Sequence, residues 1–295
     1  MRSYSFVTVD VFTERRFGGN PLAVFPDAHG LSAEEMQALA AELNLSETAF
    51  VLPPSDPANT ARVRIFHRTA EMPFAGHPNI GTAIVLARMG RDRDGVLLFE
   101  EIAGRVEVRV ERDAGGAPER ATLTAPRTLS VGAEIPARTV AACVGLHDAD
   151  VVLATHPPRV ASVGVHFVIA QVAPEALARA IPDVRQFRVA VDERPDMNGR
   201  FSLLLYAPGE DRFRARMFAP LAGTVEDPAT GSANAALAAL LLSHTGEAEM
   251  RFQVSQGVEM GRPSLLDVSA FRTRDGIAAT VAGGCVPMFR GTVEL

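Results

Sequence analysis

The chain has 295 residues, of which 47% are hydrophobic and 22% are charged, a balance typical of a globular protein rather than a disordered one. That length is enough for two domains of ordinary size. The formal net charge of −6 and the lack of any basic run argue against nucleic acid or an anionic membrane surface as a partner.

The first half has the pattern of short strands and two helices. The N-terminus, MRSYSFVTVDVF, alternates as a strand does and lacks the apolar core of a signal peptide, so we expect a cytoplasmic protein. No apolar run reaches the roughly 18 residues of a membrane span. Ser32 and Glu35 form a capping box before a helix, and Asn44 is its expected C-terminal cap. The expected elements are strands at 6–9, 22–25, 45–52, 62–66, 95–102 and 104–113, and helices after Ser32 and at 80–88.

The second half repeats this order of elements. Strands are expected at 164–172, 186–191, 201–207, 212–218, 250–256, 265–271, 277–283 and 284–295, and helices at 175–181 and 233–244. Strand-rich halves with one prominent helix each predict an α+β fold rather than alternating βαβ units. We place the boundary in the stretch APRTLSVGAEIP, which gives lobes of residues 1–130 and 131–295, with the last strand free to cross back to the first lobe.

One short device is present twice, as EMPFAGHPNIGTAIVL and as EDPATGSANAAL. A constant shift of 155 aligns four positions: Glu71 with Glu226, Pro73 with Pro228, Gly76 with Gly231, and Asn79 with Asn234. A helix N-terminus presents unpaired N–H groups and a partial positive charge, so it receives anions, and a glycine lets a ligand come close to the backbone. Either stretch alone fits an ordinary glycine-rich turn. Their matched spacing favours two helix starts that face one cleft.

The two copies differ where chemistry is expected. His77 in the first copy corresponds to Ser232 in the second, and Met72 corresponds to Asp227. Duplication followed by divergence would leave such a pair, a symmetric scaffold with different side chains at the two helix starts.

Glu47, in NLSETAF, is a further candidate for chemistry. It lies between a helix and an apolar strand, where burial would raise the pKa of its carboxyl and make it a proton shuttle. Read alone, it also fits a solvated residue at a strand's edge. The shift of 155 carries it onto Ser202, which is not an acid, so the sequence offers one base rather than two.

The basic and metal-binding residue types limit the chemistry. All 29 basic residues are arginine, which excludes a lysine Schiff base with pyridoxal phosphate and a Walker A lysine. The seven histidines are scattered, and Cys143 and Cys285 have no metal-like spacing, so we expect no metal site and two buried thiols. The chain is therefore expected to work without a metal or an organic cofactor.

Four stretches together resemble the PhzF-like family of phenazine-biosynthesis isomerases: VDVFTERRFGGNPLAVF, AAELNLSETAFV, MPFAGHPNIGTA and EDPATGSANAAL. They occur in that order through nearly the whole chain. The resemblance implies the diaminopimelate epimerase-like fold, in which two pseudo-symmetric lobes each wrap a strongly bent mixed sheet or barrel around a central helix, with the site between them. It also implies a cofactor-free enzyme that forms a homodimer.

The resemblance also assigns roles to residues. It implies Glu47 as the catalytic acid/base, His77 and Asp227 as its polar partners, and backbone donors at Gly76 and Gly231. The expected substrate-binding set is Gly76, Asn79, Thr230, Gly231 and Ser232. Related epimerases and racemases use a cysteine at each helix start, and this chain has none there, so a two-thiol racemase is disfavoured.

The leading hypothesis is an isomerase that moves a proton within a small carboxylate-bearing substrate. A single base returns the proton to the same face, which gives allylic isomerisation rather than racemisation. Two alternatives stay open: a non-catalytic protein that binds a small anion or metabolite on the same scaffold, and a one-base epimerase. The expected partners are the small-molecule carboxylate and a second copy of the chain, with no nucleic acid and no membrane.

Overall fold

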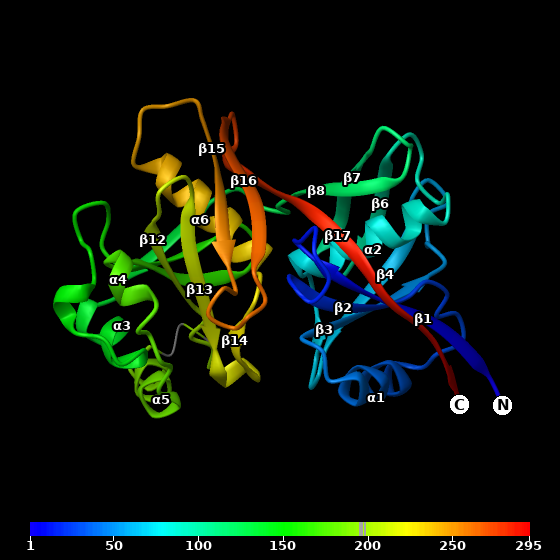
Figure 1. The fold of residues 1–295 in the computed structure, drawn as a ribbon, viewed down its shortest axis with the longest axis horizontal. Coiled ribbons are helices and arrows are strands. Elements are labelled where there is room, and N and C mark those ends of the chain that lie inside the picture. Colours follow the sequence, from blue (N-terminus) through cyan, green and yellow to red (C-terminus); the bar gives the residue numbers. More distant parts are fainter. Residues whose placement is uncertain (195–196, 198) are drawn as a thin grey trace. The chain divides into compact units, whose positions relative to one another are not determined.

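Figure 1 shows the computed structural model, which describes residues 1–194, 197 and 199–295. Its contacts divide the chain into two compact units: unit 1 comprises Met1–Pro126 with Thr280–Leu295, and unit 2 comprises Arg127–Ala279. The expected domains, 1–130 and 131–295, stay a prediction.

Unit 1 is a closed barrel around one helix. Its strands are β1 (Ser3–Val11), β2 (Asn20–Phe25), β3 (Glu47–Leu52), β4 (Ala61–His67), β5 (Glu71–Met72), β6 (Val96–Glu101), β7 (Gly104–Arg112), β8 (Pro118–Thr124) and most of β17 (Gly276–Glu294). All of them except β5 pair in the cyclic order β1, β2, β3, β4, β6, β7, β8, β17 and back to β1. The hairpin strand β5 pairs with β4.

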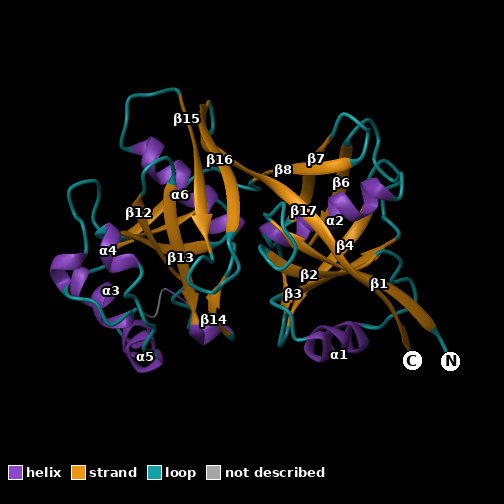
Figure 2. Cartoon of the chain, in the orientation of Figure 1, coloured by secondary structure: helices purple, strands orange, loops and turns teal. Residues whose placement is uncertain are grey.

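Helix α2 (Gly76–Arg88) is the core of unit 1. It lies among the strands of unit 1 (Figure 2), where it contacts β1, β2, β3, β7 and β8. It is buried from Gly76 through Ala87. The helix lies close to the strands at Gly81, where a Cβ would lie 2.6 Å from the Leu22 side chain and 2.9 Å from that of Val11. Any larger residue at that position would push the helix away from the strands.

Helix α1 (Ala33–Leu43) forms outside this barrel, as the sequence predicts. Ser32 and Glu35 make the capping box, and Asn44 ends the helix in the left-handed region with φ 51°. The buried face of α1 packs on an aromatic cluster that includes Phe25 and Phe50, whose rings stack with centroids 4.8 Å apart.

Unit 2 wraps a second set of strands around α6 (Gly231–Ser243). The strands are β9 (Ser130–Glu134), β10 (Arg159–Ser162), β11 (His166–Gln171), β12 (Leu203–Pro208), β13 (Phe213–Ala219), β14 (Thr224–Asp227), β15 (Glu249–Gln256) and β16 (Ser264–Thr273). Helix α6 contacts β10, β11, β15 and β16. Three shorter helices, α3 (Ala137–Cys143), α4 (Pro174–Leu177) and α5 (Val184–Asp192), pack outside the strands (Figure 1).

The two units repeat one topology. Parallel pairs β2–β3 and β4–β6 correspond to β11–β12 and β13–β15. Antiparallel pairs β3–β4 and β6–β7 correspond to β12–β13 and β15–β16. The helices α2 and α6 both have 13 residues, and their ends differ by the predicted shift of 155. The pseudo-symmetric α+β fold is therefore confirmed.

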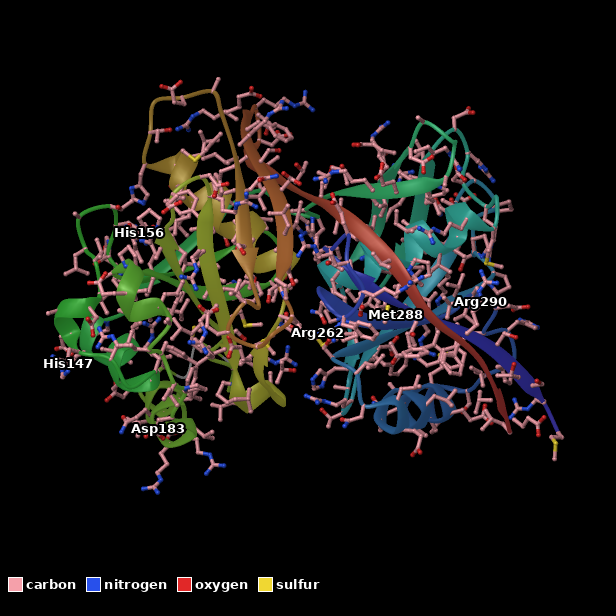
Figure 3. The ribbon with its side chains drawn as sticks, in the orientation of Figure 1. His147, His156, Asp183, Arg262, Met288 and Arg290 are labelled. Carbon is pink, nitrogen blue, oxygen red and sulfur yellow. The ribbon has the colours of Figure 1, made fainter. Side chains whose placement is uncertain are left out.

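Several predicted elements are wrong in type or extent. Residues 186–191 form most of helix α5 rather than a strand. Asp183 (Figure 3) caps the helix, and only Phe187 and Ala190, three residues apart, are buried. The helix expected at 175–181 ends at Leu177. Helices α2 and α6 begin four and two residues before the predicted 80 and 233.

The C-terminal region also differs from the prediction. The two strands expected at 277–283 and 284–295 are one strand, β17. Pro287, which cannot donate to a ladder, sits where the pairing with β1 shifts between Thr8 and Val9. The sequence patterns missed α3 and the strands β5, β8, β9, β10 and β14. No helix in the described part of the chain is long and apolar enough to cross a membrane.

Candidate active site

The starts of α2 and α6 differ from that of α1. Ser32 caps α1 with its side chain, whereas the corresponding residues of α2 and α6, Ala75 and Thr230, make no side-chain cap among the described residues. Neither α2 nor α6 has an acidic residue in its first turn. Both helix starts therefore keep N–H groups that can donate hydrogen bonds to an anionic ligand.

In unit 1, β3 and α2 bring Glu47 and His77 together. Glu47 is the first residue of β3, paired with Leu22 of β2 and His67 of β4, and His77 lies in the first turn of α2. His77 Nε2 is 3.5 Å from Glu47 Oε2, and the two side chains are 5% and 17% exposed. Glu47 is thus a mostly buried acid rather than a solvated edge residue. Hydrogen bonds between catalytic groups are often this long in structures without a substrate.

His77 is neutral and has a defined tautomer. Burial lowers the pKa of its imidazole to about 3, so the ring carries no charge near neutral pH. The Ser46 hydroxyl donates to Asn20 Oδ1 at 2.7 Å, which turns the Asn20 amide nitrogen towards His77 Nδ1 at 3.3 Å. Nδ1 is therefore the acceptor, and the ring proton is on Nε2, which faces Glu47.

Sequence reasoning missed Asn20. It stands in FGGNP, inside one of the stretches that carry the family resemblance, but it is 57 residues from His77. Only the barrel, which puts the first residue of β2 beside the start of α2, brings the two together.

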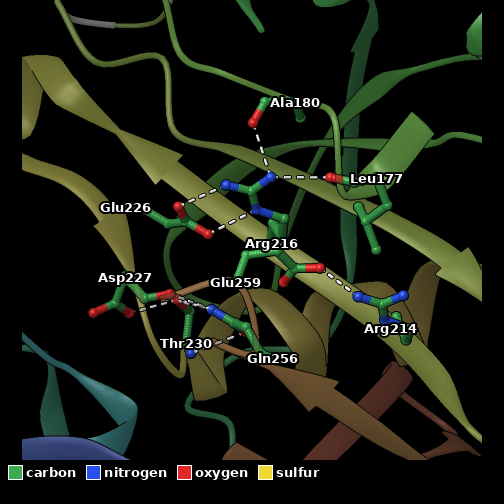
Figure 4. Close-up of polar contacts among 9 residues, drawn as sticks. All are labelled: Leu177, Ala180, Arg214, Arg216, Glu226, Asp227, Thr230, Gln256 and Glu259. Carbon is green, nitrogen blue, oxygen red and sulfur yellow. Dashed lines mark hydrogen bonds and ion pairs between the residues drawn. The ribbon is translucent and has the colours of Figure 1, made fainter. Parts of the chain in front are cut away.

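In unit 2, Asp227 ends β14 and is buried within a polar network (Figure 4). The Thr230 hydroxyl donates to Asp227 Oδ2 at 2.5 Å. Gln256, at the end of β15, donates from Nε2 to the Asp227 carbonyl at 2.8 Å and to Thr230 Oγ1 at 3.1 Å. Its Oε1 accepts from the Thr230 amide at 3.2 Å. Gln256 therefore holds the loop before α6, and the sequence patterns did not single it out.

The aligned asparagines also serve the helix starts. Asn79 Nδ2 donates to the Ala75 carbonyl and Asn234 Nδ2 to the Thr230 carbonyl, both at 3.0 Å. Both side chains are buried. The geometry gives each a role in holding the first helical turn, and the substrate-binding role of Asn79 stays a prediction.

The aligned glutamates are paired with arginines on the neighbouring strand. Arg216 of β13 donates two hydrogen bonds of 2.8 Å to the Glu226 carboxylate (Figure 4). It also donates to the Leu177 and Ala180 carbonyls. Arg64 of β4 grips Glu71 with two bonds of 2.7 Å. The guanidinium groups stack on aromatic rings, Arg64 on Phe66 and Arg216 on Phe218. These pairs fix the hairpins that lead into the two helices.

The candidate residues thus form two groups, each within its own unit. Unit 1 brings Glu47 together with His77 in the turn that also contains Gly76 and Asn79. Unit 2 brings Asp227 together with Thr230, which directly precedes Gly231 and the half-buried Ser232. That the two groups line one cleft stays a prediction. Among the described residues, no three His, Cys, Asp or Glu side chains cluster as metal ligands do, and Cys143 and Cys285 are free and buried.

Comparison with known proteins agrees with this fold. A family model described as phenazine biosynthesis-like protein (PhzC-PhzF) matches residues 9–291. Over an alignment of 299 residues, the chain is 36% identical to the trans-2,3-dihydro-3-hydroxyanthranilate isomerase of Pseudomonas chlororaphis, covering 99% of this chain and 100% of that one.

Two solved structures are also similar. A PhzF-family phenazine biosynthesis protein from Bacillus anthracis matches over 100% of both chains with a TM-score of 0.87 and 26% identity. A Pseudomonas aeruginosa protein described as a predicted epimerase matches over 99% of both chains with a TM-score of 0.81 and 32% identity. The chain therefore belongs to the phenazine biosynthesis-like PhzC-PhzF family, and it is an isomerase with an epimerase-like fold.

Proposed function

We propose that the protein shifts a proton within a small carboxylate-bearing substrate, with Glu47 as the only proton carrier and no metal or organic cofactor. The observation that carries this proposal is the Glu47–His77 contact at 3.5 Å, with His77 held neutral and its Nδ1 hydrogen-bonded by Asn20. An imidazole whose pKa is about 3 does not compete for the proton near neutral pH. It can instead donate from Nε2 and hold the carboxyl of Glu47 in place.

The proposed reaction moves one proton and one double bond. The Glu47 carboxylate removes a proton from a carbon next to a C=C bond, and the electrons of the broken C–H bond form a new C=C bond. The electrons of the original double bond take the proton back from Glu47 at the far carbon. One C–H bond breaks and one forms, so no oxidant or reductant is needed.

Charge that develops on the substrate needs donors that are already oriented. The uncapped first turns of α2 and α6 offer backbone N–H groups, including those at Gly76 and Gly231. An oriented donor of this kind contributes about 3–4 kcal/mol to the stability of the transition state. We assign the substrate carboxylate to these amides and to Ser232, with Asp227 as a further polar partner.

The name of the Pseudomonas chlororaphis relative suggests the first substrate to test, trans-2,3-dihydro-3-hydroxyanthranilate. This compound and other small cyclic and amino carboxylates would be incubated with the protein in D₂O and examined by NMR. Isomerisation with deuterium at one new position, on one face, is the expected result. Loss of configuration at a single carbon without movement of a double bond would instead indicate the one-base epimerase.

A non-catalytic binder on the same scaffold would need the helix starts but not Glu47. Glu47→Gln separates the two functions, because it keeps the side chain's shape and removes the base. We expect the variant to bind a carboxylate ligand with near wild-type affinity and to lose turnover. A wild-type protein that binds such ligands but turns none of them over would favour the binder.

A further inference from the structure

Glu101 of unit 1 occupies the position that Gln256 occupies in unit 2. Each is the last residue of its strand, β6 or β15, and the shift of 155 that relates the helices also relates 101 to 256. Strand β6 pairs in parallel with β4 and in antiparallel with β7. Strand β15 pairs in the same way with β13 and β16. The unit 2 network therefore shows which contacts this position makes.

In unit 2, that position supplies both donors and acceptors. Gln256 accepts from Asn234 Nδ2 at 2.7 Å and from the Thr230 amide, and it donates to the Asp227 carbonyl and to Thr230 Oγ1. The donated bonds tie the loop before α6 to β15. A carboxylate at this position could accept but could not donate.

In unit 1, the same place holds the two buried carboxyl oxygens of Glu101. Neither oxygen has a hydrogen bond of good geometry among the described residues, although the Asn79 side chain is close enough to lower the pKa of the carboxyl. Asn79 Oδ1 also lacks a partner there, as Asn234 Oδ1 does in unit 2. The backbone also links the two segments, since the Ala103 amide donates to the Pro73 carbonyl at 3.0 Å. Buried polar oxygens without donors are costly, and one added proton would supply a donor among them.

We propose that Glu101 is a positioning residue that works as a neutral carboxylic acid, giving the start of α2 the hydrogen bond that the Gln256 amide gives the start of α6. Its O–H donates to the loop before α2, as the Gln256 amide donates to the loop before α6, and its carbonyl oxygen accepts from Asn79 as Gln256 does from Asn234. The inference rests on the proposed function, because the turn held in this way carries His77 and Gly76.

The electrostatics of the site agree with a neutral Glu101. Burial raises the pKa of its carboxyl to about 8, and the Asn79 amide opposes this only in part. The neighbouring strands' charged residues, Arg62 of β4 and Arg105 of β7, pair in register with Glu100. On α2, the titratable group at this end is His77, which is itself neutral.

The raised pKa fixes the sign of the pH dependence. A carboxyl whose folded-state pKa is above its ordinary 4.5 favours the folded state fully below pH 4.5, and this contribution is lost as the pH rises through about 8. Glu101→Gln supplies a permanent donor of the same shape and removes the titration. Glu111→Gln, at an exposed position of β7, is the matched control.

The first test is thermal unfolding between pH 5 and 9, without substrate. The Tm of wild type and of Glu111→Gln should fall by several degrees relative to that of Glu101→Gln as the pH rises from 5 to 8. Glu101→Ala, which restores no donor, should be destabilised throughout this range. Parallel pH profiles for Glu101→Gln and wild type would overturn the proposal.

The second test distinguishes positioning from a merely structural role. The ¹⁵N shifts of the His77 ring should change as Glu101 titrates near pH 8, and this change should be absent in Glu101→Gln. Ring shifts that stay constant while the Tm profile changes would show that Glu101 supports the fold alone. Turnover that survives in Glu47→Gln would refute the proposed proton carrier while leaving both of these readouts intact, so the two failures can be told apart.

Discussion

The starts of α2 and α6 are held by the same kinds of contact, which we call the shared frame, but the side chains expected to do chemistry differ between them. The shared parts are an arginine–glutamate pair before the helix, an asparagine bonded back to the residue before the helix, and an uncapped first turn. The different parts are Glu47 against Ser202, His77 against Ser232, and Glu101 against Gln256. The glutamates and asparagines that the 155-residue shift leaves unchanged hold the two helix starts, and the arginines that pair with the glutamates lie 152 residues apart. The positions that the shift changes carry different side chains in the two units, and our proposal gives them different roles.

Removing an arginine from the shared frame should have the largest effect on stability. Arg216→Ala leaves Glu226 charged and largely buried and removes donors from two carbonyls, so we expect a loss of about 3–5 kcal/mol in the free energy of unfolding. Arg64→Ala should cost less, because the Arg64 and Glu71 side chains are 18% and 25% exposed, against 7% and 14% for Arg216 and Glu226. Urea unfolding of both variants measures this, and equal losses would contradict the comparison.

Among the positions that differ between the two units, Glu47 should have the largest effect on activity. Glu47→Gln should lower kcat by roughly 100-fold or more, the scale of general acid–base catalysis, with the fold retained. Ser202→Ala, at the corresponding position of unit 2, is the matched control and should stay within about twofold of wild type. The assay is turnover of whichever carboxylate isomerises in the D₂O screen. A comparable loss in both variants would mean that the two positions share a structural role.

The sequence predicted the repeat better than it predicted the contacts. The 155-residue shift located both central helices because their patterns are local and similar. Their first turns were placed too late, since glycine, Pro78 and polar residues are typical of loops and only burial inside the strands makes them helical. Residues 186–191 alternate as a strand does, but they form part of helix α5, which Asp183 caps.

The residues that complete the candidate site were missed for a different reason. Asn20 and His77 meet through barrel closure, and Gln256 reaches Thr230 across 26 residues, so no local pattern records either contact. Applying the shift beyond the helices would have found one of them, because it pairs Glu101 with Gln256. Glu47 and His77 were found because they stand in the short stretches that carry the resemblance.

Asn20 should have an intermediate effect. Asn20→Ala removes the donor to His77 Nδ1, so the imidazole can place its proton on either nitrogen and Nε2 no longer always donates towards Glu47. We expect kcat to fall by about tenfold, below the roughly 100-fold scale that misplacement of a catalytic group can reach. Ring ¹⁵N shifts of His77 report the tautomer directly. A single unchanged tautomer in the variant would show that Asn20 does not set it.

The smallest expected effect concerns the caps. Ser32→Ala should cost about 1 kcal/mol, because α1 loses the acceptor that satisfies its first turn. Ala75→Ser adds a hydroxyl at the N-cap of α2, where the backbone is extended, with φ −151° and ψ 141°. The hydroxyl can accept from the His77 N–H, since Pro78, the third residue of the helix, has none. If the uncapped turn is kept for an anion, the new hydroxyl should add about 0.5–1 kcal/mol of stability while weakening carboxylate binding. Urea unfolding measures the change in stability, and isothermal titration with a carboxylate ligand measures the change in affinity. A gain in stability without a loss of carboxylate affinity would mean that the first turn of α2 does not bind the ligand.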